Sequence, residues 1–588
     1  MRPRIWATPW SRRPAEAAAA CGRVRPRPRR TLRPRHAWCR GFVRDRPAQR
    51  RAGEPWKVVV PVSSSSGPLF EAVHAGESER ALPVIPTSLV EVDVVTRRRD
   101  GLPTATPVYA GESGADLASA ARSWSVPESL LNAAGATSAV GSVTSLPLPD
   151  DRLGWTVGVE SGRPDQWRSA GAALVRAVRE RLTSASDDDS DPSDLGDALD
   201  AEYVQVMLPD AADAELISEV TLGLALGDYR FRVTGESSKP RLRKALLLVP
   251  ESAEVETLRQ AAARAREWAA ATALARDLAN APSNFKDPAW LTGTAARLAE
   301  EVPNLSATVR HEKWLAAHDF GGVLAVGGGS SRPPRLLELR WRPPGAASAP
   351  HVVLVGKGIT FDTGGISIKP AEGMHLMRTD MAGGGAVVAA MLSIARLDLP
   401  VRVTAFVPAA ENHVSGSSYR PGDIVRHYGG TTTEVTNTDA EGRMVLADAL
   451  AYGIEQHDPD LVVDVATLTG AMKVALGLRT GGVFASDDAV AHRVRDAGER
   501  VAENWWPMPL IADHADDVHS EIADVRQCPP GPGGVMAAMF LREFTSGRPW
   551  AHLDIAGPGR AERNYAEVVP GATGFAARTL IEVVAGMQ

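Results

Sequence analysis

Short apolar runs alternate with longer alanine-rich stretches along the first half of the chain. Four runs have the length and β-branched content of strands, and the stretch 167–182 between them has the composition of a helix. The runs are LVEVDVV (89–95), WTVGVE (155–160), YVQVMLP (203–209) and KALLLVP (244–250). This alternation predicts a smaller N-terminal α/β domain over residues 56–250, with WKVVVPV (56–62) as its first strand.

The second half repeats the pattern after a long helical stretch. Residues 251–281 contain neither proline nor glycine, which predicts a linking helix over 251–284. The strand candidates beyond it are 351–356, 401–408, 431–438, 461–470, 481–486 and 551–557, and the helix candidates begin near Ala382, Met444 and Met536. Buried strands separated by helices form a mostly parallel sheet that helices cover on both faces. Residues 285–588 are therefore predicted to be a second α/β domain, and polar sites in such folds gather at the carboxyl ends of the strands.

Two polar segments interrupt this pattern. Residues 1–55 are rich in arginine and proline, without a hydrophobic period, and hold 16 arginines against three acidic residues. Three interpretations are open: a disordered extension or a segment upstream of the true start, an arginine-rich transit peptide, or a nucleic-acid-binding arm. The insert SASDDDSDPSD (184–194) is predicted to be a solvated acidic loop.

Composition and charge narrow the function classes. Hydrophobic residues make up 44% and charged residues 23% of the chain, which is typical of a soluble globular protein, and no apolar run has the length of a membrane span. Outside residues 1–55 there are 49 basic and 68 acidic residues, a net charge of −19, which argues against nucleic acid as the main partner. Cys21, Cys39 and Cys528 form no CxxC pair, which favours a reducing, cytoplasmic location.

The segment NTDAEGR (437–443) places three charged residues at alternate positions, directly before the apolar run MVLADALAYG. On an extended chain Asp439, Glu441 and Arg443 would project from one face. Charges crowded in this way need water, one another, or a bound group between them. We expect an extended segment that ends beside the start of a helix.

A second cluster lies in the glycine-punctuated segment 355–387, which carries Lys357, Asp362, Lys369 and Asp380. Taken singly, each of these residues fits a structural role, such as that of a turn aspartate. The GKG sequence lacks the GxxxxGK[ST] spacing of a phosphate-binding loop. The sequence also contains neither GxSxG nor HExxH. The motifs that usually indicate a serine hydrolase or a zincin are therefore absent.

Combined, the two clusters predict a metal centre. Asp362, Asp380, Asp439 and Glu441 all follow predicted strands or precede predicted helices of one domain. Four carboxylates at one sheet edge repel one another, and a pair of divalent cations that share carboxylates removes that penalty. Oxygen donors without cysteine or histidine suit zinc, manganese or magnesium. A lysine such as Lys357 can also be a ligand as the neutral amine, because a nearby dication depresses its pKa.

The sequences GKGITFDTGGISIKP (356–370) and NTDAEGR closely resemble the two signatures of the leucyl aminopeptidase family, the M17 cytosol aminopeptidases. The resemblance continues through ARDLANAPSN (275–284), YRPGDIV (419–425), DVATLTGAM (464–472), WAHLDIAG (550–557) and GATGFAARTLIE (571–582). The N-terminal domain is similar to the family only over residues 223–235. The resemblance implies a cytosolic two-metal exopeptidase, with residues 285–588 as its metallopeptidase catalytic domain.

By this resemblance, Lys357 and Asp380 are expected to hold one metal ion. Asp439 is expected to hold the other through its side chain and its backbone carbonyl. Asp362 and Glu441 are expected to bridge both ions. Manganese and zinc are the expected metals.

The resemblance also assigns the groups that act on the substrate. Lys369 is expected to polarise the peptide carbonyl, and Arg443 to anchor a bicarbonate ion that serves as general base. Met377, Thr467 and Gly470 are expected to form an apolar cup for the first side chain. The neighbouring His375 and His413 are expected not to be ligands, and His552, Asp554 and Asp448 are expected to be structural.

The expected reaction is hydrolysis of the N-terminal residue from peptides by a hydroxide that bridges two ions. A free α-amine must be neutral to bind a metal, which restricts cleavage to the first residue. The family usually assembles as a hexamer, so a homohexamer is expected. Two alternatives stay open: a DNA-binding regulator built on the same fold, and a non-catalytic member, which would have to lack at least one ligand.

Overall fold

The first sheet is built from the N-terminal part of the chain. The computed structural model describes residues 85–112, 114–148, 153–187, 202–233, 241–345 and 348–588. Within them, seven strands pair in the order β1-β7-β6-β2-β5-β4, with β3 on β2. They are β1 (Glu91–Val95), β2 (Thr104–Gly111), β3 (Gly114–Asp116), β4 (Val143–Pro147), β5 (Leu153–Glu160), β6 (Tyr203–Met207) and β7 (Lys244–Leu248). The four strands predicted from apolar runs in this part are confirmed as β1, β5, β6 and β7, whereas the predicted strand 56–62 and residues 1–55 lie outside the described residues.

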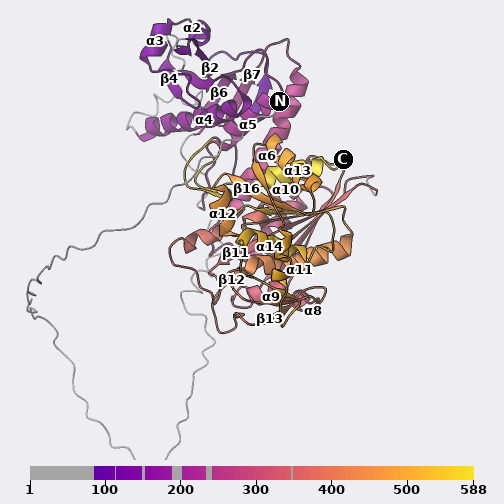
Figure 1. Ribbon diagram of the computed structural model, residues 1–588. Helices are drawn as coiled ribbons and strands as arrows, with labels where there is room; N and C mark the ends of the chain where they lie inside the picture. The colour runs from indigo at the N-terminus through magenta and orange to yellow at the C-terminus, as the bar shows by residue number, and fades with distance from the viewer. Residues whose placement is uncertain (1–84, 113, 149–152, 188–201, 234–240, 346–347) are drawn as a thin grey trace, which may run out of the picture. The chain divides into compact units, whose positions relative to one another are not determined.

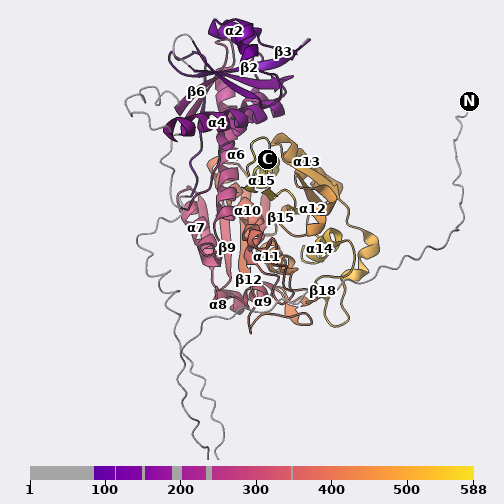
Figure 2. The same cartoon turned by 90° about the vertical axis from the view of Figure 1, so that its left-hand side faces the viewer.

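Helices cover this sheet through apolar side chains. They are α2 (Ala118–Trp124), α3 (Glu128–Ala133), α4 (Pro164–Asp187) and α5 (Ala214–Leu226), and Figure 2 shows α2 and α4 beside the indigo strands. Trp167 and Leu174 of α4 share a buried core with Val157 of β5 and Val204 of β6. The α4 helix runs through residue 187, so the first four residues of the predicted acidic loop are helical, and its remainder lies outside the described residues.

The second sheet is larger and mostly parallel. Among the described residues nine strands pair in the order β17-β16-β19-β15-β10-β12-β9-β8, with β11 on β12. The strands are β8 (Leu305–Arg310), β9 (Arg335–Trp341), β10 (His351–Gly356), β11 (Gly358–Asp362), β12 (Arg402–Asn412), β15 (Leu461–Ala466), β16 (Thr480–Ala485), β17 (Asn504–Met508) and β19 (Trp550–Asp554). The central strands β19, β15, β10 and β12 are parallel, and the antiparallel pairs are β16 with β19, β12 with β9, and β9 with β8.

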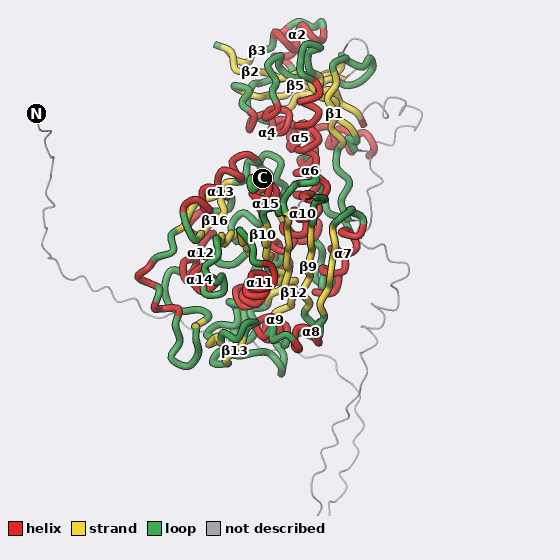
Figure 3. The backbone as a smooth tube through the Cα atoms, turned by 90° about the vertical axis from the view of Figure 1, so that its right-hand side faces the viewer, coloured by secondary structure: helices red, strands yellow, loops and turns green. Residues whose placement is uncertain are grey.

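The helices of this part surround the sheet, as Figure 3 shows in red around yellow strands. The helical elements are α6 (Val255–Asn280), α7 (Pro288–Glu300), α8 (Glu312–Ala317), α9 (Gly321–Gly327), η3 (Met374–Thr379), α10 (Ala382–Arg396), α11 (Glu441–His457), α12 (Gly470–Leu476), α13 (Asp488–Arg500), η4 (Ala512–His514), η5 (Asp516–Val518), α14 (Gly533–Arg542) and α15 (Ala577–Ala585). Small additional strands are β13 (Ile424–Arg426), β14 (Thr432–Glu434), β18 (Val525–Arg526), β20 (Arg560–Ala561) and β21 (Gly571–Ala572). The predicted α/β fold class is confirmed, with α6 as the predicted long helix (Figure 1).

Alternate residues of β10 enter two different cores, which explains why this strand is apolar throughout. Val352 and Leu354 pack with α6, α10 and α15, whereas Val353 and Val355 pack with α9, α11 and α14. A strand covered on both faces needs apolar residues at every position. The described residues belong to one compact unit that begins at Ser78, so the predicted domain boundaries at residues 250 and 284 stay a prediction.

Glycines let α10 approach the central strands closely. A Cβ at Gly356 would lie 2.6 Å from the Cα of Gly384, and a Cβ at Gly383 would lie 2.1 Å from the carbonyl oxygen of Val465. Only glycine avoids these clashes, which accounts for the run of glycines at the start of the helix. The close approach sets the start of α10 against the carboxyl ends of β10 and β15, where polar loops emerge.

Two predicted elements are wrong in this region. The predicted strand 431–438 forms a strand only over Thr432–Glu434, and the predicted extended face of NTDAEGR does not exist. Residues 437–440 form a turn, and α11 begins at Glu441, three residues before the expected start at Met444. Charges at alternate positions are typical of a strand, but here Glu441, Gly442 and Arg443 form the start of α11. No helix within the described ranges combines the length and apolar character that a bilayer crossing needs.

Candidate metal centre

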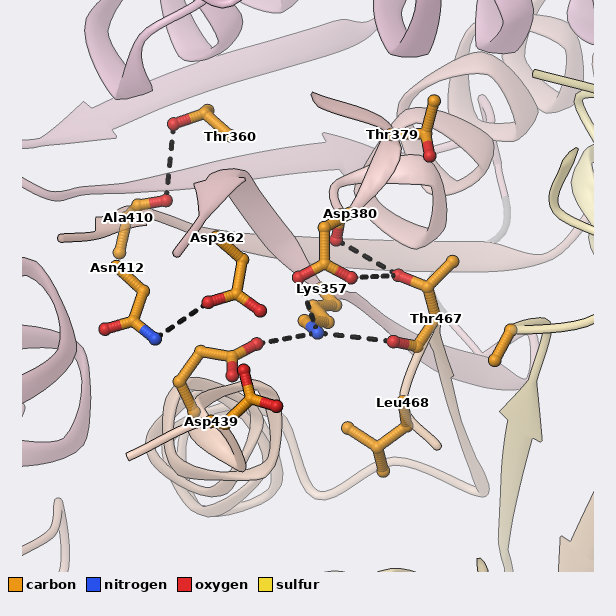
Figure 4. A network of polar contacts seen from close by, with 12 residues as sticks. Lys357, Thr360, Asp362, Thr379, Asp380, Ala410, Asn412, Asp439, Thr467 and Leu468 are labelled. Carbon is orange, nitrogen blue, oxygen red and sulfur yellow. Dashed lines mark hydrogen bonds and ion pairs between the residues drawn. The ribbon is translucent and has the colours of Figure 1, made fainter. Parts of the chain in front are cut away.

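Four acidic residues and two lysines converge at the carboxyl end of the second sheet. Figure 4 shows Lys357 among Asp362, Asp380 and Asp439. They come from the ends of different elements: Lys357 from the link between β10 and β11, Asp362 from the end of β11, Lys369 from the following loop, Asp380 from the end of η3, Asp439 from the turn before α11, and Glu441 from the first residue of α11. Asp362, Asp439 and Glu441 each offer a carboxylate oxygen, and these oxygens lie within 4.8 Å of one another. The structure therefore brings together every residue that was expected to hold or flank a metal.

The two lysines lie between the carboxylates. Lys357 Nζ lies 2.8 Å from Asp380 Oδ2 and 2.8 Å from Glu441 Oε1. Lys369 Nζ lies 2.8 Å from Asp362 Oδ2 and also contacts Asp439 Oδ1. Each lysine thus links two acids from different elements.

The site is buried on one side and open on the other. Asp362, Asp380 and Glu441 are buried, and Glu441 is only 1% exposed. The side chains of Asp439 and Lys369 are 33% and 20% exposed. A substrate therefore has access to the centre from the side of Lys369 and Asp439.

Burial and mutual repulsion perturb the titration of these groups. Burial raises the pKa of Asp362 to about 6, and the charge of Glu441 adds to the rise. Burial also raises the pKa of Asp380 and of Glu441, against the lowering effect of Lys357. Burial would lower the pKa of Lys357, but the carboxylates around it outweigh that effect and raise it. Burial and mutual repulsion therefore both disfavour the ionised form of these carboxylates.

The donor set fits divalent cations. Glu441 Oε2 is buried and accepts no hydrogen bond from any described residue, and Asp380 Oδ2 and Asp439 Oδ1 have only their ion pairs with the lysines. Buried carboxylate oxygens without donors are costly unless a cation binds them. Carboxylates without cysteine or histidine are the ligands of hard and borderline divalent ions.

Three polar residues outside the expected set hold these carboxylates in place. Asn412 Nδ2 donates to Asp362 Oδ1 at 2.8 Å and to the carbonyl oxygen of Thr438 at 3.0 Å. The side chain of Gln527 accepts from the backbone amides of Thr436 and Asn437, and donates to the carbonyl oxygen of Ala440. Neither Asn412 nor Gln527 was identified from the sequence, because their partners are distant along the chain. The predicted strand 401–408 stops four residues short of Asn412, which is the last residue of the observed β12.

The third such residue is Asp554, which was expected to be structural. It accepts hydrogen bonds from the backbone amides of Leu468 and Thr469, at 3.1 and 3.0 Å, and from Thr469 Oγ1 at 2.7 Å. The loop that it holds carries Thr467, whose hydroxyl donates to Asp380 Oδ1 at 2.7 Å. The carbonyl oxygen of Thr467 also accepts from Lys357 Nζ at 3.3 Å.

The residues expected to line the substrate cup lie on neighbouring elements of this end of the sheet. Met377 is half-buried in η3, and Gly470 is exposed at the first position of α12. Thr467 is half-buried and bonded to Asp380, so it supports a carboxylate in addition to any contact with substrate. A Cβ at Gly470 would meet no atom within 4 Å, which leaves open space at this position.

Arg443 is buried two residues into the helix that begins with Glu441. Its Nη1 donates to the carbonyl oxygen of Gln527 at 2.8 Å, and its buried Nε has no hydrogen-bond partner among the described residues. Burial lowers the pKa of Arg443. In a helix, positions 441 and 443 are about 200° apart, so the two side chains do not share a face as the sequence had suggested.

The remaining polar residues named from the sequence are engaged away from the four carboxylates. Asp448 accepts from the amide of Val323 at 2.9 Å and pairs with His427 at 2.7 Å. His552 pairs with Asp464 at 2.6 Å inside the sheet. His375 receives a hydrogen bond from Arg378 on its carbonyl oxygen, and the ring of His413 contacts the carbonyl oxygen of Val414.

Comparison with known proteins places this geometry among aminopeptidases. The family model described as "Cytosol aminopeptidase family, catalytic domain" matches residues 273–581. A probable cytosol aminopeptidase of Nocardia farcinica (strain IFM 10152) is 47% identical over 378 residues, which cover 63% of this chain and 73% of the relative. A probable cytosol aminopeptidase of Mycobacterium bovis (strain BCG / Pasteur 1173P2) is 41% identical over 471 residues, covering 78% of this chain and 87% of the relative.

Among solved structures, the chain is similar to the bottromycin maturation enzyme BotP in complex with Mn. The TM-score is 0.70 at 37% sequence identity, and the match covers 82% of this chain and 99% of that chain. A second structure of BotP gives a TM-score of 0.69, also at 37% identity. The likeness therefore extends beyond the residues matched by the family model.

Proposed function

The chain belongs to the cytosol aminopeptidase family and is a metallo-exopeptidase hydrolase, and on that premise we propose that it is a two-metal leucyl-type aminopeptidase. The proposed reaction is release of the N-terminal residue from peptides with a free α-amine. The observation that carries the proposal is the meeting of four carboxylates and two lysines at one sheet edge, where buried Glu441 Oε2 has no donor among the described residues.

The proposed ligands divide between two divalent ions, manganese or zinc. Lys357, as a neutral amine, and Asp380 would hold one ion, and Asp439 would hold the other. Asp362 and Glu441 would be shared by both, which agrees with their burial and with the closeness of their oxygens to Asp439. Two divalent ions at this centre supply Lewis acidity, which polarises a carbonyl and makes water more acidic.

Lys369 is the proposed electrophilic residue. Its ammonium lies at the open side of the centre, and the nearby Asp362 and Asp439 keep it protonated by raising its pKa against the effect of burial. A protonated amine in this place can donate a hydrogen bond to the oxygen of the scissile carbonyl as negative charge develops on it. Such preorganised donors are typically the largest electrostatic contribution to catalysis.

Arg443 is proposed to bind the anion that accepts a proton, with bicarbonate as the expected anion. Among the described residues, its buried guanidinium has no partner for Nε and one neutral partner for Nη1, the carbonyl oxygen of Gln527. A buried guanidinium without a carboxylate partner favours a bound anion.

We also propose which residues contact the substrate and how the chain assembles. Met377, Thr467 and Gly470 would contact the first side chain of the peptide. Met377 lies in η3, which ends next to Asp380, Thr467 in the loop before α12 bonds to Asp380, and Gly470 is the first residue of α12. A homohexamer, a cytoplasmic location and the division into domains at residues 250 and 284 are proposed from the family.

The proposal is tested with the full chain and a panel of aminoacyl p-nitroanilides. Dialysis against a chelator should abolish release of p-nitroaniline, and addition of Mn²⁺ or Zn²⁺ should restore it. An N-acetylated leucyl substrate is the matched control and should not be cleaved. Absence of metal-dependent release from every substrate, or equal cleavage of the acetylated substrate, would contradict the proposed function.

A further inference from the structure

An arginine-rich pocket lies outside the metal centre and shares no proposed ligand with it. Its volume is about 760 Å³, within the range of small-molecule sites. The charged residues that line it are Arg176 and Arg179 of α4, Asp228, Arg230 and Arg232 from the segment after α5, and Arg378 of η3. Five guanidinium groups therefore face a pocket that has one carboxylate.

Few of these guanidinium groups are neutralised. Arg179 contacts Asp228, and Arg230 Nε lies 3.8 Å from the same carboxylate oxygen. Arg176, Arg232 and Arg378 have no carboxylate of a described residue within ion-pair distance. The hydrogen bonds of Arg176 go to the neutral carbonyl oxygens of Gly227 and Ala566, and that of Arg378 goes to the carbonyl oxygen of His375.

Two further acids act through space on these arginines, Glu180 on Arg179 and Glu567 on Arg176, and two carboxylates do not offset the excess positive charge. Glu567 acts on Arg176 through space, but it is already held by two other arginines. Arg168 Nε lies 3.0 Å from one of its oxygens and Arg578 Nη2 lies 3.0 Å from the other. Glu567 is also buried, so it cannot turn toward the pocket without losing these pairs.

Repulsion by Arg230 and Arg176 contributes to the lowered pKa of Arg179. Burial lowers the pKa of Arg176. Burial lowers the pKa of Arg179, and the charges of Arg230 and Arg176 lower it further. A group of like charges in a partly dehydrated pocket is stabilised by an anion bound among them.

We propose that this pocket binds a small polyanion, a ligand that carries phosphate groups or several carboxylates. Guanidinium groups bind both kinds of oxyanion with paired hydrogen bonds. Tyr229 and Phe231 add aromatic surface to the lining, which suits a ligand with an organic body. The charges gather in a concave pocket of a chain whose formal net charge is −6, which favours a small ligand over a nucleic-acid backbone.

The test is isothermal titration calorimetry of the full chain at fixed ionic strength. The probes are inorganic phosphate, adenosine monophosphate and tricarballylate, so that phosphate and carboxylate chemistry are separated. Chelator-treated protein is titrated in parallel, which removes any heat from binding at the metal centre. At least one probe should bind with a stoichiometry of one per chain.

The double variant R230Q/R232Q should weaken that binding about 10- to 100-fold, since two charge-assisted contacts are lost. R97Q is the matched control, because Arg97 is an exposed arginine outside the pocket that pairs with Glu251 at 3.3 Å, and it should leave the affinity unchanged. R232E is a second variant whose folding does not depend on the Asp228 pair. Melting temperatures verify that each variant is folded.

Three results would overturn the proposal. The first is that none of the probes binds. The second is that R97Q weakens binding as much as R230Q/R232Q and R232E do. The third is that a short DNA duplex binds the wild-type chain through these arginines while no small probe does, which would make the pocket part of a nucleic-acid surface.

Discussion

Lys357 and Glu441 form a buried ion pair, with Nζ 2.8 Å from Oε1, although β10 and α11 lie far apart in the sequence. The pair connects the end of the central strand to the first residue of a helix, where a carboxylate also interacts favourably with the helix dipole. It sets an amine, which can act as a ligand once deprotonated, beside a carboxylate whose Oε2 accepts no hydrogen bond from the part of the chain that the structure describes. The proposed metal centre depends on this relationship.

Gly442 is the residue that leaves room for Lys357. A Cβ at this position would lie 2.6 Å from Lys357 Cε and 2.8 Å from its Nζ. G442A should therefore displace the lysine and weaken metal binding about tenfold or more, as for lost supporting contacts at metal sites. The measurement is metal affinity by competition with a fluorescent chelator.

G293A is the matched control, because Gly293 also lies in a helix and a Cβ there meets no atom within 4 Å. This substitution should keep metal affinity and raise the unfolding free energy by about 0.5–1 kcal/mol. Equal metal affinity in G442A and the wild type would contradict the placement of Lys357.

Lys369 should act in catalysis more than in metal binding. K369A should lower kcat about 10²- to 10³-fold, because a preorganised donor to the developing oxyanion is lost, while metal content stays near that of the wild type. Steady-state kinetics and elemental analysis of the same preparation measure both quantities. K313A removes an exposed lysine of α8 and should leave kcat unchanged. A K369A enzyme with wild-type kcat would exclude the electrophilic role.

Asp554 should influence the centre through the loop 467–470. D554N removes an acceptor from the set of hydrogen bonds to Leu468 and Thr469, so Thr467 should lose its fixed position beside Asp380. We expect kcat/KM to fall about tenfold, with the largest effect on substrates that have a bulky first residue. The readout is the ratio of kcat/KM for leucyl and alanyl substrates. If D554N has a lower melting temperature but the same ratio of kcat/KM for leucyl and alanyl substrates as the wild type, Asp554 contributes to stability only.

Stability should fall on mild acidification because of two histidines of the second sheet region, the buried His351 and the half-buried His457. Burial lowers the pKa of His351 to about 4, with further lowering by His457 and Arg402, and burial with Arg340 lowers that of His457 to about 4. The unfolded chain binds these protons near pH 6.5, whereas the folded chain resists them until about pH 4. Protonation therefore favours unfolding as the pH falls through this window.

The free energy of unfolding should therefore decrease less between pH 7 and pH 5 in H351Q than in the wild type. The difference should be about 1 kcal/mol, allowing for screening by solvent. The measurement is the unfolding free energy from urea titration at each pH. H413Q changes an exposed histidine and serves as the control. A pH profile of H351Q parallel to that of the wild type would contradict this account.

Much of the fold could be predicted from the sequence where periodicity and burial agree. The run HVVLVG gives β10 with its observed bounds, because a strand covered on both faces is apolar at every position. The extended segment expected at NTDAEGR was wrong, since Asp439, Glu441 and Arg443 alternate as strand residues do but the last two belong to α11. Alternation over a few residues cannot separate a strand from a turn that leads into a helix.

The residues of the proposed metal centre were identified from two segments of the sequence, 355–387 and 437–443, and the structure brings their side chains together. Asn412, Gln527 and the role of Asp554 in holding the loop at Leu468 could not be predicted in this way. Asn412 and Asp362 are 50 positions apart, Gln527 and Asn437 are 90 apart, and Asp554 and Leu468 are 86 apart. No local pattern encodes contacts of this kind, because they depend on how the strands are ordered in the sheet.

The central claim is that Asp362 is shared between two metal ions. The most direct measurement is the metal content of the wild-type chain and of D362A after reconstitution with Mn²⁺ and removal of free ion, by elemental mass spectrometry. D423N, which changes a more exposed aspartate that pairs with Arg420, is the matched control. The account predicts two ions per chain in the wild type and in D423N, and loss of metal in D362A. Two full equivalents in D362A would contradict it.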